Sequence, residues 1–126
     1  MSKIMVIDDD VKLSALIKDF LEPHKYQVVC YNNPVVAIKK IKPIKPDLII
    51  LDIMMPEMDG FQFAEELREN KDWLDVPVVV ITAKDLTSKD HNRLKGNVEA
   101  IMQKGSYTKD ELLSEVGNRI KKLKEK

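Results

Sequence analysis

Five short apolar segments recur along the chain, and most of them are rich in β-branched residues. They lie at residues 4–7, 27–31, 48–51, 78–81 and 100–102. Most are continuous apolar runs rather than alternating patterns, which is typical of strands covered on both faces of a sheet. We therefore predict five strands, most of them buried.

Amphipathic helical patterns fill the intervals between these strands. After Asp10, apolar residues at helical spacing form one stripe: Leu13, Leu16, Ile17, Phe20 and Leu21. The later helices are expected to start at Asn33, Asp59, about Thr87 and near Thr108, where capping residues precede each pattern. Proline follows Asn33 directly, which is a favourable first helical position.

Strand and helix therefore alternate five times. This order predicts an α/β fold, a doubly wound (βα)5 unit with a five-stranded parallel sheet and helices on both faces. We expect residues 1–126 to form a single domain. Ligands in such open sheets bind beyond the carboxyl ends of the strands.

Composition narrows the possible functions. The chain of 126 residues is 44% hydrophobic and 33% charged, with 21 basic and 21 acidic residues. This balance argues against direct nucleic-acid binding, and no apolar run approaches the ~20 residues of a membrane span. No signal peptide is evident, so we expect a cytoplasmic protein. The single cysteine, Cys30, excludes an internal disulfide and is expected to be buried in its strand.

Polar residues follow four of the five predicted strands. They are Asp8, Asp9 and Asp10 after the first strand, Asp52 after the third, Thr82 at the end of the fourth and Lys104 after the fifth. Any one of them alone is more often an ordinary turn residue, and Asp10 fits a helix cap best. Their convergence on one edge of the sheet is what favours a functional site.

The chemistry of this set points to a metal and a phosphoryl group. Closely packed carboxylates repel each other, and a hard divalent cation relieves that repulsion. Oxygen-only ligands favour Mg²⁺, with Mn²⁺ as a substitute. The lysine and threonine would serve as partners of a phosphoryl group. No glycine-rich nucleotide-binding loop is present. The set is therefore better interpreted as a site where a carboxylate accepts a phosphoryl group than as a nucleotide-binding site.

Four segments together resemble the receiver domain of two-component response regulators. They are Val6–Asp9, Leu51–Gly60, Ile81–Ala83 and Lys104. The resemblance covers essentially the whole chain and implies a flavodoxin-like sheet with strand order 2-1-3-4-5.

The resemblance also implies a role for each matching residue. Asp52 would be the phosphoacceptor, and Thr82 and Lys104 would bind its phosphoryl group. Asp9, Asp52 and the backbone carbonyl of Met54 would hold Mg²⁺, with Asp8 assisting through water. The donor would be a phosphohistidine on a histidine kinase or phosphotransfer protein.

Such a chain would be a signalling phosphoacceptor rather than an enzyme. No output domain is expected after the fifth helix. The signal would then pass to a downstream protein through the face formed by the fourth helix, fifth strand and fifth helix, by a population shift between two loop arrangements.

Two positions depart from the family pattern. Ile101 stands where an aromatic residue usually lies three positions before the lysine, so an aromatic switch is not expected. Gly105 replaces the usual proline after the lysine, and we therefore predict a trans bond between Lys104 and Gly105.

Two other functions are compatible with parts of the sequence. A pseudo-receiver would bind proteins without taking up phosphate, which the departures at Ile101 and Gly105 leave open. A haloacid-dehalogenase-like phosphatase also uses an aspartate after its first strand, and Asp8 and Asp10 fit its motif superficially. Lys12 does not fit that motif, however, and the chain has no room for a cap insertion.

Overall fold

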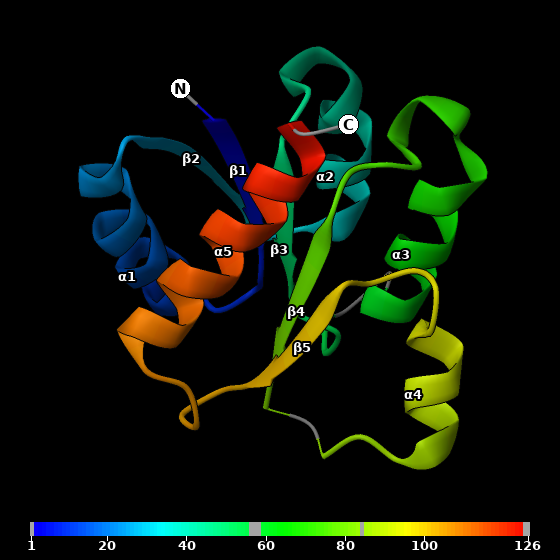
Figure 1. Cartoon of the computed structure of the whole chain (residues 1–126). Helices are drawn as coiled ribbons and strands as arrows, with labels where there is room; N and C mark the ends of the chain where they lie inside the picture. The colour runs from blue at the N-terminus through cyan, green and yellow to red at the C-terminus, as the bar shows by residue number, and fades with distance from the viewer. Residues whose placement is uncertain (1, 56–58, 84, 125–126) are drawn as a thin grey trace.

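Five parallel strands form one sheet in the order β2-β1-β3-β4-β5 (Figure 1). The structure is a computed structural model that describes residues 2–55, 59–83 and 85–124. The strands are β1 (Ser2–Ile7), β2 (Tyr26–Tyr31), β3 (Leu48–Leu51), β4 (Val78–Thr82) and β5 (Ala100–Gln103). This arrangement confirms the predicted α/β fold and strand order.

In the described part of the chain, four α-helices connect the strands and a fifth follows β5. They are α1 (Val11–Leu21), α2 (Pro34–Ile44), α3 (Gly60–Glu69), α4 (Ser88–Leu94) and α5 (Lys109–Lys124). Two short 3-10 helices, Glu22–His24 and Lys71–Trp73, extend the ends of α1 and α3 and were not predicted. Residues 56–58, which belong to the segment that resembles receiver domains, lie outside the described residues.

Capping side chains begin the helices where the sequence predicts. The Asp10 carboxylate accepts the Leu13 N–H at 3.1 Å, and the Asp59 carboxylate accepts the Gln62 N–H at 2.8 Å. Asn33 and Thr87 cap α2 and α4 in the same way. Each cap satisfies a backbone donor that the first helical turn leaves unpaired.

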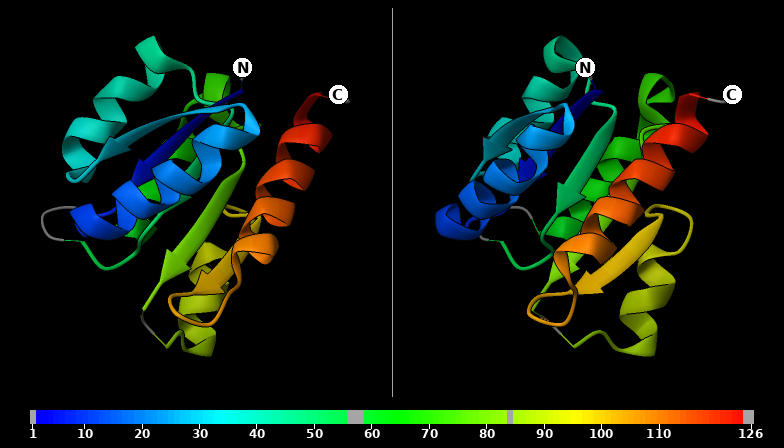
Figure 2. Two further views of the ribbon diagram at one scale, coloured as in Figure 1. Left: turned by 90° about the vertical axis from the view of Figure 1, so that its left-hand side faces the viewer. Right: turned by 60° about the vertical axis from the view of Figure 1, so that its left-hand side comes forward.

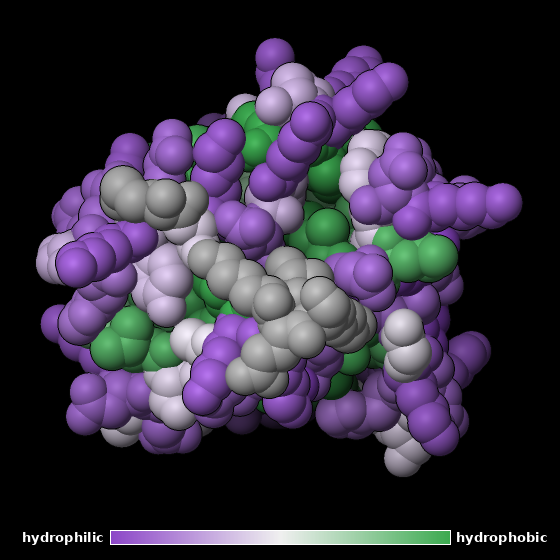
Figure 3. Space-filling model, turned by 45° about the horizontal axis from the view of Figure 1, so that its top comes forward, coloured by the Kyte–Doolittle hydropathy of each residue, from purple (hydrophilic) through white to green (hydrophobic). Residues whose placement is uncertain are grey.

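The helices cover both faces of the sheet (Figures 1 and 2). One apolar layer joins the sheet to α1 and α5, through residues such as Ile17 and Val116. The other joins it to α2, α3 and α4, through residues such as Ile41, Phe63 and Leu94. On the face shown in Figure 3, hydrophilic side chains predominate and apolar ones lie in recesses between them.

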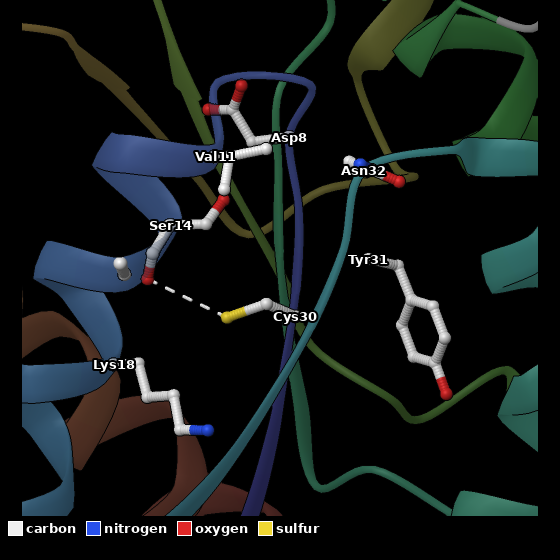
Figure 4. A pocket seen from close by; sticks show the side chains of 8 residues that line it. Asp8, Val11, Ser14, Lys18, Cys30, Tyr31 and Asn32 are labelled. Carbon is white, nitrogen blue, oxygen red and sulfur yellow. Dashed lines mark hydrogen bonds between the residues drawn. The ribbon is translucent and has the colours of Figure 1, made fainter.

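The three central strands are more deeply buried than the two at the edges. Every residue of β3 and β4 is buried, whereas β2 and β5 are only partly covered. Cys30 lies on β2 and is exposed, so the prediction of a buried thiol is wrong. An edge strand has a neighbour on one side only, so Cys30 stays open to solvent although its Sγ atom lies 3.6 Å from the Ser14 carbonyl oxygen of α1 (Figure 4).

Two glycines in helices have opposite surroundings. A Cβ atom on Gly60 would lie 2.5 Å from the Ile53 Cα and 2.7 Å from the Asp52 carbonyl oxygen. Backbone atoms cannot yield to such a contact, so only glycine allows α3 to begin this close to the end of β3. At Gly117, the nearest atom would be the Tyr26 hydroxyl oxygen at 3.6 Å, an ordinary van der Waals distance.

These surroundings predict opposite effects of alanine on stability. Gly60→Ala should lower the free energy of unfolding by about 1–3 kcal/mol, because it forces the backbone apart. Gly117→Ala should raise it by up to about 1 kcal/mol, because alanine favours the helix and fits the space. Urea unfolding of both variants measures the difference. A Gly60→Ala protein as stable as the unsubstituted one would contradict the packing described.

Candidate functional site

Backbone hydrogen bonds position the polar residues one step beyond the strands. The Asp8 N–H donates to the carbonyl that ends β2 at 3.1 Å, and the Asp52 N–H donates to the carbonyl that ends β1 at 2.9 Å. The Lys104 N–H donates to the Thr82 carbonyl at 2.8 Å. Asp8, Asp52 and Lys104 therefore each extend the backbone hydrogen bonding of the sheet by one bond. These bonds fix the backbone from which each side chain projects.

Three carboxylates meet at this edge. Asp8, Asp9 and Asp52 each offer an oxygen, and these oxygens all lie within 4.8 Å of one another. Asp8 and Asp52 are only 4% and 3% exposed, whereas Asp9 is open to solvent. Two buried negative charges and one exposed charge therefore share a single cleft.

Lys104 lies between the two buried carboxylates. Its Nζ atom is 3.0 Å from an Asp8 oxygen and 3.0 Å from an Asp52 oxygen. The sequence predicted Lys104 as a partner for a phosphoryl group, and the structure shows that it also holds the two carboxylates together. One ammonium group cannot neutralise three carboxylates, so the cluster keeps a net negative charge.

The other oxygens of the buried carboxylates accept backbone hydrogen bonds. Asp8 Oδ1 accepts the Asp10 N–H at 2.8 Å, and Asp52 Oδ1 accepts the Met54 N–H at 3.1 Å. These bonds fix the rotation of both side chains. The loop after β3 thus turns back on Asp52 and brings Met54 near the acidic cluster.

Burial and charge shift two pKa values in this cleft. Burial raises the pKa of Asp8 to about 6, and the nearby charge of Asp52 adds to this effect, while Lys104 opposes it. Burial disfavours the Lys104 ammonium, but its hydrogen bonds to Asp52 and Asp8 outweigh that effect and raise its pKa. Lys104 therefore stays charged at neutral pH, whereas Asp8 ionises at a cost to the folded state.

The donor set fits a hard divalent cation. Mg²⁺ prefers oxygen ligands and commonly uses one or two carboxylates together with water. A cation at the three carboxylates would relieve the repulsion that Lys104 leaves uncompensated. The structure thus brings together Asp8, Asp9 and Asp52 as an acidic pocket that could bind a metal, as the sequence predicted.

Two further residues complete the edge. Thr82 ends β4, is 1% exposed and pairs in register with Gln103 of β5, directly before Lys104. Tyr107 was missed by the sequence analysis. Burial raises the pKa of Tyr107, the charge of Lys104 lowers it and the charge of Asp8 raises it, so this side chain lies within electrostatic range of the site. A lone tyrosine in a loop gives no sequence signal for such a position.

Gly105 has a conformational role in the loop that carries Lys104. Its φ angle is +80°, and the Ser106 N–H donates to the Gln103 carbonyl at 3.1 Å, which closes a four-residue turn. A positive φ at the third turn position favours glycine and is inaccessible to proline. No peptide bond is cis in the described part of the chain, which confirms the trans bond between Lys104 and Gly105.

Comparisons with known proteins agree with this geometry. The family described as the response regulator receiver domain matches residues 4–117. The alkaline phosphatase synthesis transcriptional regulatory protein PhoP of Bacillus subtilis is 40% identical over 83 residues, covering 66% of this chain and 34% of that protein. The response regulator MprA of Mycobacterium leprae is 29% identical over 122 residues, covering 97% of this chain and 52% of that protein.

Solved structures of receiver domains are similar over the whole chain. The signal receiver domain of a signal transduction histidine kinase from Syntrophus aciditrophicus has a TM-score of 0.90 at 27% identity, covering 100% of this chain and 95% of that one. The receiver domain of the Francisella response regulator 1452 has a TM-score of 0.85 at 28% identity, covering 97% of this chain and 98% of that one.

The match extends beyond half of the chain and includes the residues of the acidic pocket. The chain spans about a third to a half of the length of the curated relatives it matches. None of the described helices is long and apolar enough to cross a membrane. By fold, by site geometry and by sequence, the chain belongs to the receiver domain family of two-component response regulators.

Proposed function

We propose that this chain is the phosphoacceptor module of a two-component phosphorelay, with Asp52 as the acceptor. The observation that carries the proposal is the position of the Lys104 Nζ, 3.0 Å from both Asp8 and Asp52, beside three carboxylate oxygens within 4.8 Å of one another. This arrangement supplies a nucleophile, a fixed cation and a set of metal ligands in one cleft. Residues 1–126 act as a single domain.

The transfer forms one bond and breaks one. A carboxylate oxygen of Asp52 attacks the phosphorus of a phosphohistidine on a histidine kinase or phosphotransfer protein, and the bond from phosphorus to the imidazole nitrogen breaks. The imidazole leaves and takes up a proton. Lys104 then exchanges its contact with Asp52 for one with a phosphoryl oxygen, and the Thr82 hydroxyl donates to another. The module itself turns over no substrate and is not an enzyme.

The metal site would use Asp8, Asp9, Asp52 and the backbone carbonyl of Met54. Bound Mg²⁺, or Mn²⁺ in its place, supplies positive charge toward the phosphoryl oxygens as negative charge develops on them. The exposed Asp9 gives the site an open side, and the two buried aspartates provide ligands that their backbone hydrogen bonds have already oriented.

The output surface is the face formed by α4, β5 and α5. A cavity of about 370 Å³ on this face is lined by apolar groups that include Leu94, Val98 and Ile101. A downstream protein can bury the exposed parts of Val98 and Ile101, whereas Leu94 is already buried in the core. The affinity of that protein would change as the loop after Thr82 shifts between two populations. Ile101 is partly buried on the edge strand β5 and offers apolar area rather than an aromatic switch.

A phosphorylation-independent binding module is the second candidate. The departures at Ile101 and Gly105 are the observations that favour it. Gly105 adopts a conformation that proline cannot, so this loop differs from the family pattern in its backbone as well as in its sequence. The following experiment separates the two functions.

Acetyl phosphate with Mg²⁺ should add one phosphoryl group to the protein. Intact-mass measurement is expected to show a single adduct that disappears in Asp52→Asn, because an amide oxygen is a far weaker nucleophile than a carboxylate. The matched control is Asp59→Asn, since Asp59 is an exposed helix cap on the same loop and asparagine caps equally well. This control should retain the adduct.

Two results would argue against phosphorylation at Asp52. An adduct of equal yield in Asp52→Asn would place the phosphoryl group elsewhere. The absence of any adduct on folded protein, with the divalent cation present, would favour the phosphorylation-independent module instead.

The raised pKa of Asp8 predicts that removing the Asp8 carboxylate increases the free energy of unfolding, by an amount that depends on pH. Between pH 3.8 and about 6 the folded protein binds more protons at Asp8 than the unfolded chain does, so its stability falls as pH rises through this interval. Without divalent cations, Asp8→Asn should therefore be the more stable protein above pH 6, by up to about 3 kcal/mol.

Urea unfolding at several pH values measures this effect. The gain should vanish below about pH 3, where Asp8 is largely protonated in both states. Asp9→Asn is the control, because Asp9 is exposed and its removal should change stability little. An Asp8→Asn protein less stable than the unsubstituted one at pH 7 would contradict the account of the cluster.

A further inference from the structure

A side-chain hydrogen bond joins the ends of β4 and β5 outside the acidic cluster. Gln103 Nε2 donates to Asp85 Oδ1 at 2.7 Å, which connects the last residue of β5 to the loop between β4 and α4 (Figure 1). Asp85 lies three residues after Thr82, and Gln103 lies one residue before Lys104. The bond therefore links the two chain segments that carry the phosphoryl-binding groups of the proposed function.

Thr82 and Gln103 project from the same face of the sheet. The two residues pair in register across β4 and β5. Side chains two positions apart in a strand share a face. Val80 and Ile101, two positions before them, both lie in the apolar layer that joins the sheet to α2, α3 and α4. The bond to Asp85 therefore lies on the same side of the sheet as the Thr82 side chain.

The loop after β4 covers this end of the sheet. Leu86 packs against the same apolar layer, and Thr82 is only 1% exposed although it ends its strand. Asp85 and Leu86 are neighbours in the chain, so the loop is fastened to this face both by a hydrogen bond and by apolar packing.

The bond lies where β4 and β5 separate. One further backbone bond follows the paired residues, from the Lys104 N–H to the Thr82 carbonyl. The chain then runs to α4 after one strand and to α5 after the other. Because β5 is an edge strand, its end has a neighbouring strand on one side only. A side-chain bond across this point restrains the two strand ends relative to each other.

We propose that Gln103 is a positioning residue for the phosphoryl group. Its bond to Asp85 holds the ends of β4 and β5 together, so that Thr82 and Lys104 reach the same phosphoryl group. Donors that are already in place bind more tightly, because less free energy is spent on ordering them. The inference rests on the proposed function and concerns the phosphoryl group alone, since the metal ligands follow β1 and β3.

Gln103→Ala should therefore separate the binding of two ligands. Its affinity for beryllofluoride, a mimic of the phosphoryl group, should fall about fivefold in the presence of Mg²⁺, which corresponds to the loss of one hydrogen bond. The Kd for Mg²⁺ alone should not change. NMR titrations of the backbone amides measure both affinities. A general loss of structure would instead weaken both ligands.

The partner of Gln103 should give the same result. Asp85→Ala is expected to weaken beryllofluoride binding about fivefold, whereas its loss of negative charge alone would favour an anionic ligand. The double variant should lose no more than either single one, because both remove the same bond. The matched control is Glu65→Ala, which removes a carboxylate that pairs with Arg93 of α4 at 3.0 Å. This control should leave beryllofluoride binding unchanged.

Exchange of donor and acceptor tests the bond itself. In the combined variant Asp85→Asn with Gln103→Glu, the amide and the carboxylate change places and the net charge is kept. Its affinity for beryllofluoride should return to within about twofold of that of the unsubstituted protein. Gln103→Glu alone places two carboxylates opposite each other and should bind at least as weakly as Gln103→Ala.

Amide hydrogen exchange provides a measurement without any ligand. The amides of residues 85–87 should exchange several times faster in Gln103→Ala, because the loop opens more often. Unchanged exchange there would overturn the inference. If the unsubstituted protein binds beryllofluoride and Gln103→Ala binds it equally well, the inference is wrong and the proposed function stands. Failure of the unsubstituted protein to bind beryllofluoride would contradict the proposed function itself.

Discussion

The burial of two neighbouring carboxylates is the constraint around which this structure is organised. Asp8 and Asp52 have lost nearly all contact with solvent, and the Lys104 ammonium between them compensates only part of their charge. Burial is the main cause of the raised pKa of Asp8, and the charge of Asp52 adds to it. A cleft in this state gains free energy from any additional positive charge, which is the property a cation-dependent phosphoacceptor requires.

The fold holds this unfavourable arrangement in place through its backbone. Asp8, Asp52 and Lys104 each continue a strand by one hydrogen bond, so none of them can move away without disrupting the sheet. Gly60 lets α3 begin directly behind Asp52, and the turn at Gly105 directs the chain away after Lys104. The central strands are buried on both faces, and their stability supports the strained cleft at their ends.

Patterns that depend on one physical effect could be predicted from the sequence. Continuous apolar runs identified the buried strands, side-chain caps identified the helix starts, and the rule that parallel strands end at one edge brought Asp52 and Lys104 together. The remaining features depend on packing between elements. The exposure of Cys30 follows from its place on the edge strand β2, and the contact of Lys104 with Asp8 depends on side-chain conformation. No local pattern encodes either of them.

The most direct test of the central claim is a titration with Mg²⁺ and beryllofluoride, which mimics a phosphoryl group on aspartate, while the backbone amides are followed by NMR. The account predicts that both additions together shift the amides around Asp52, Thr82 and Lys104 to a new saturable state. Asp52→Asn should not reach that state. Unchanged amides at these positions in folded protein, or the same response in Asp52→Asn, would contradict it.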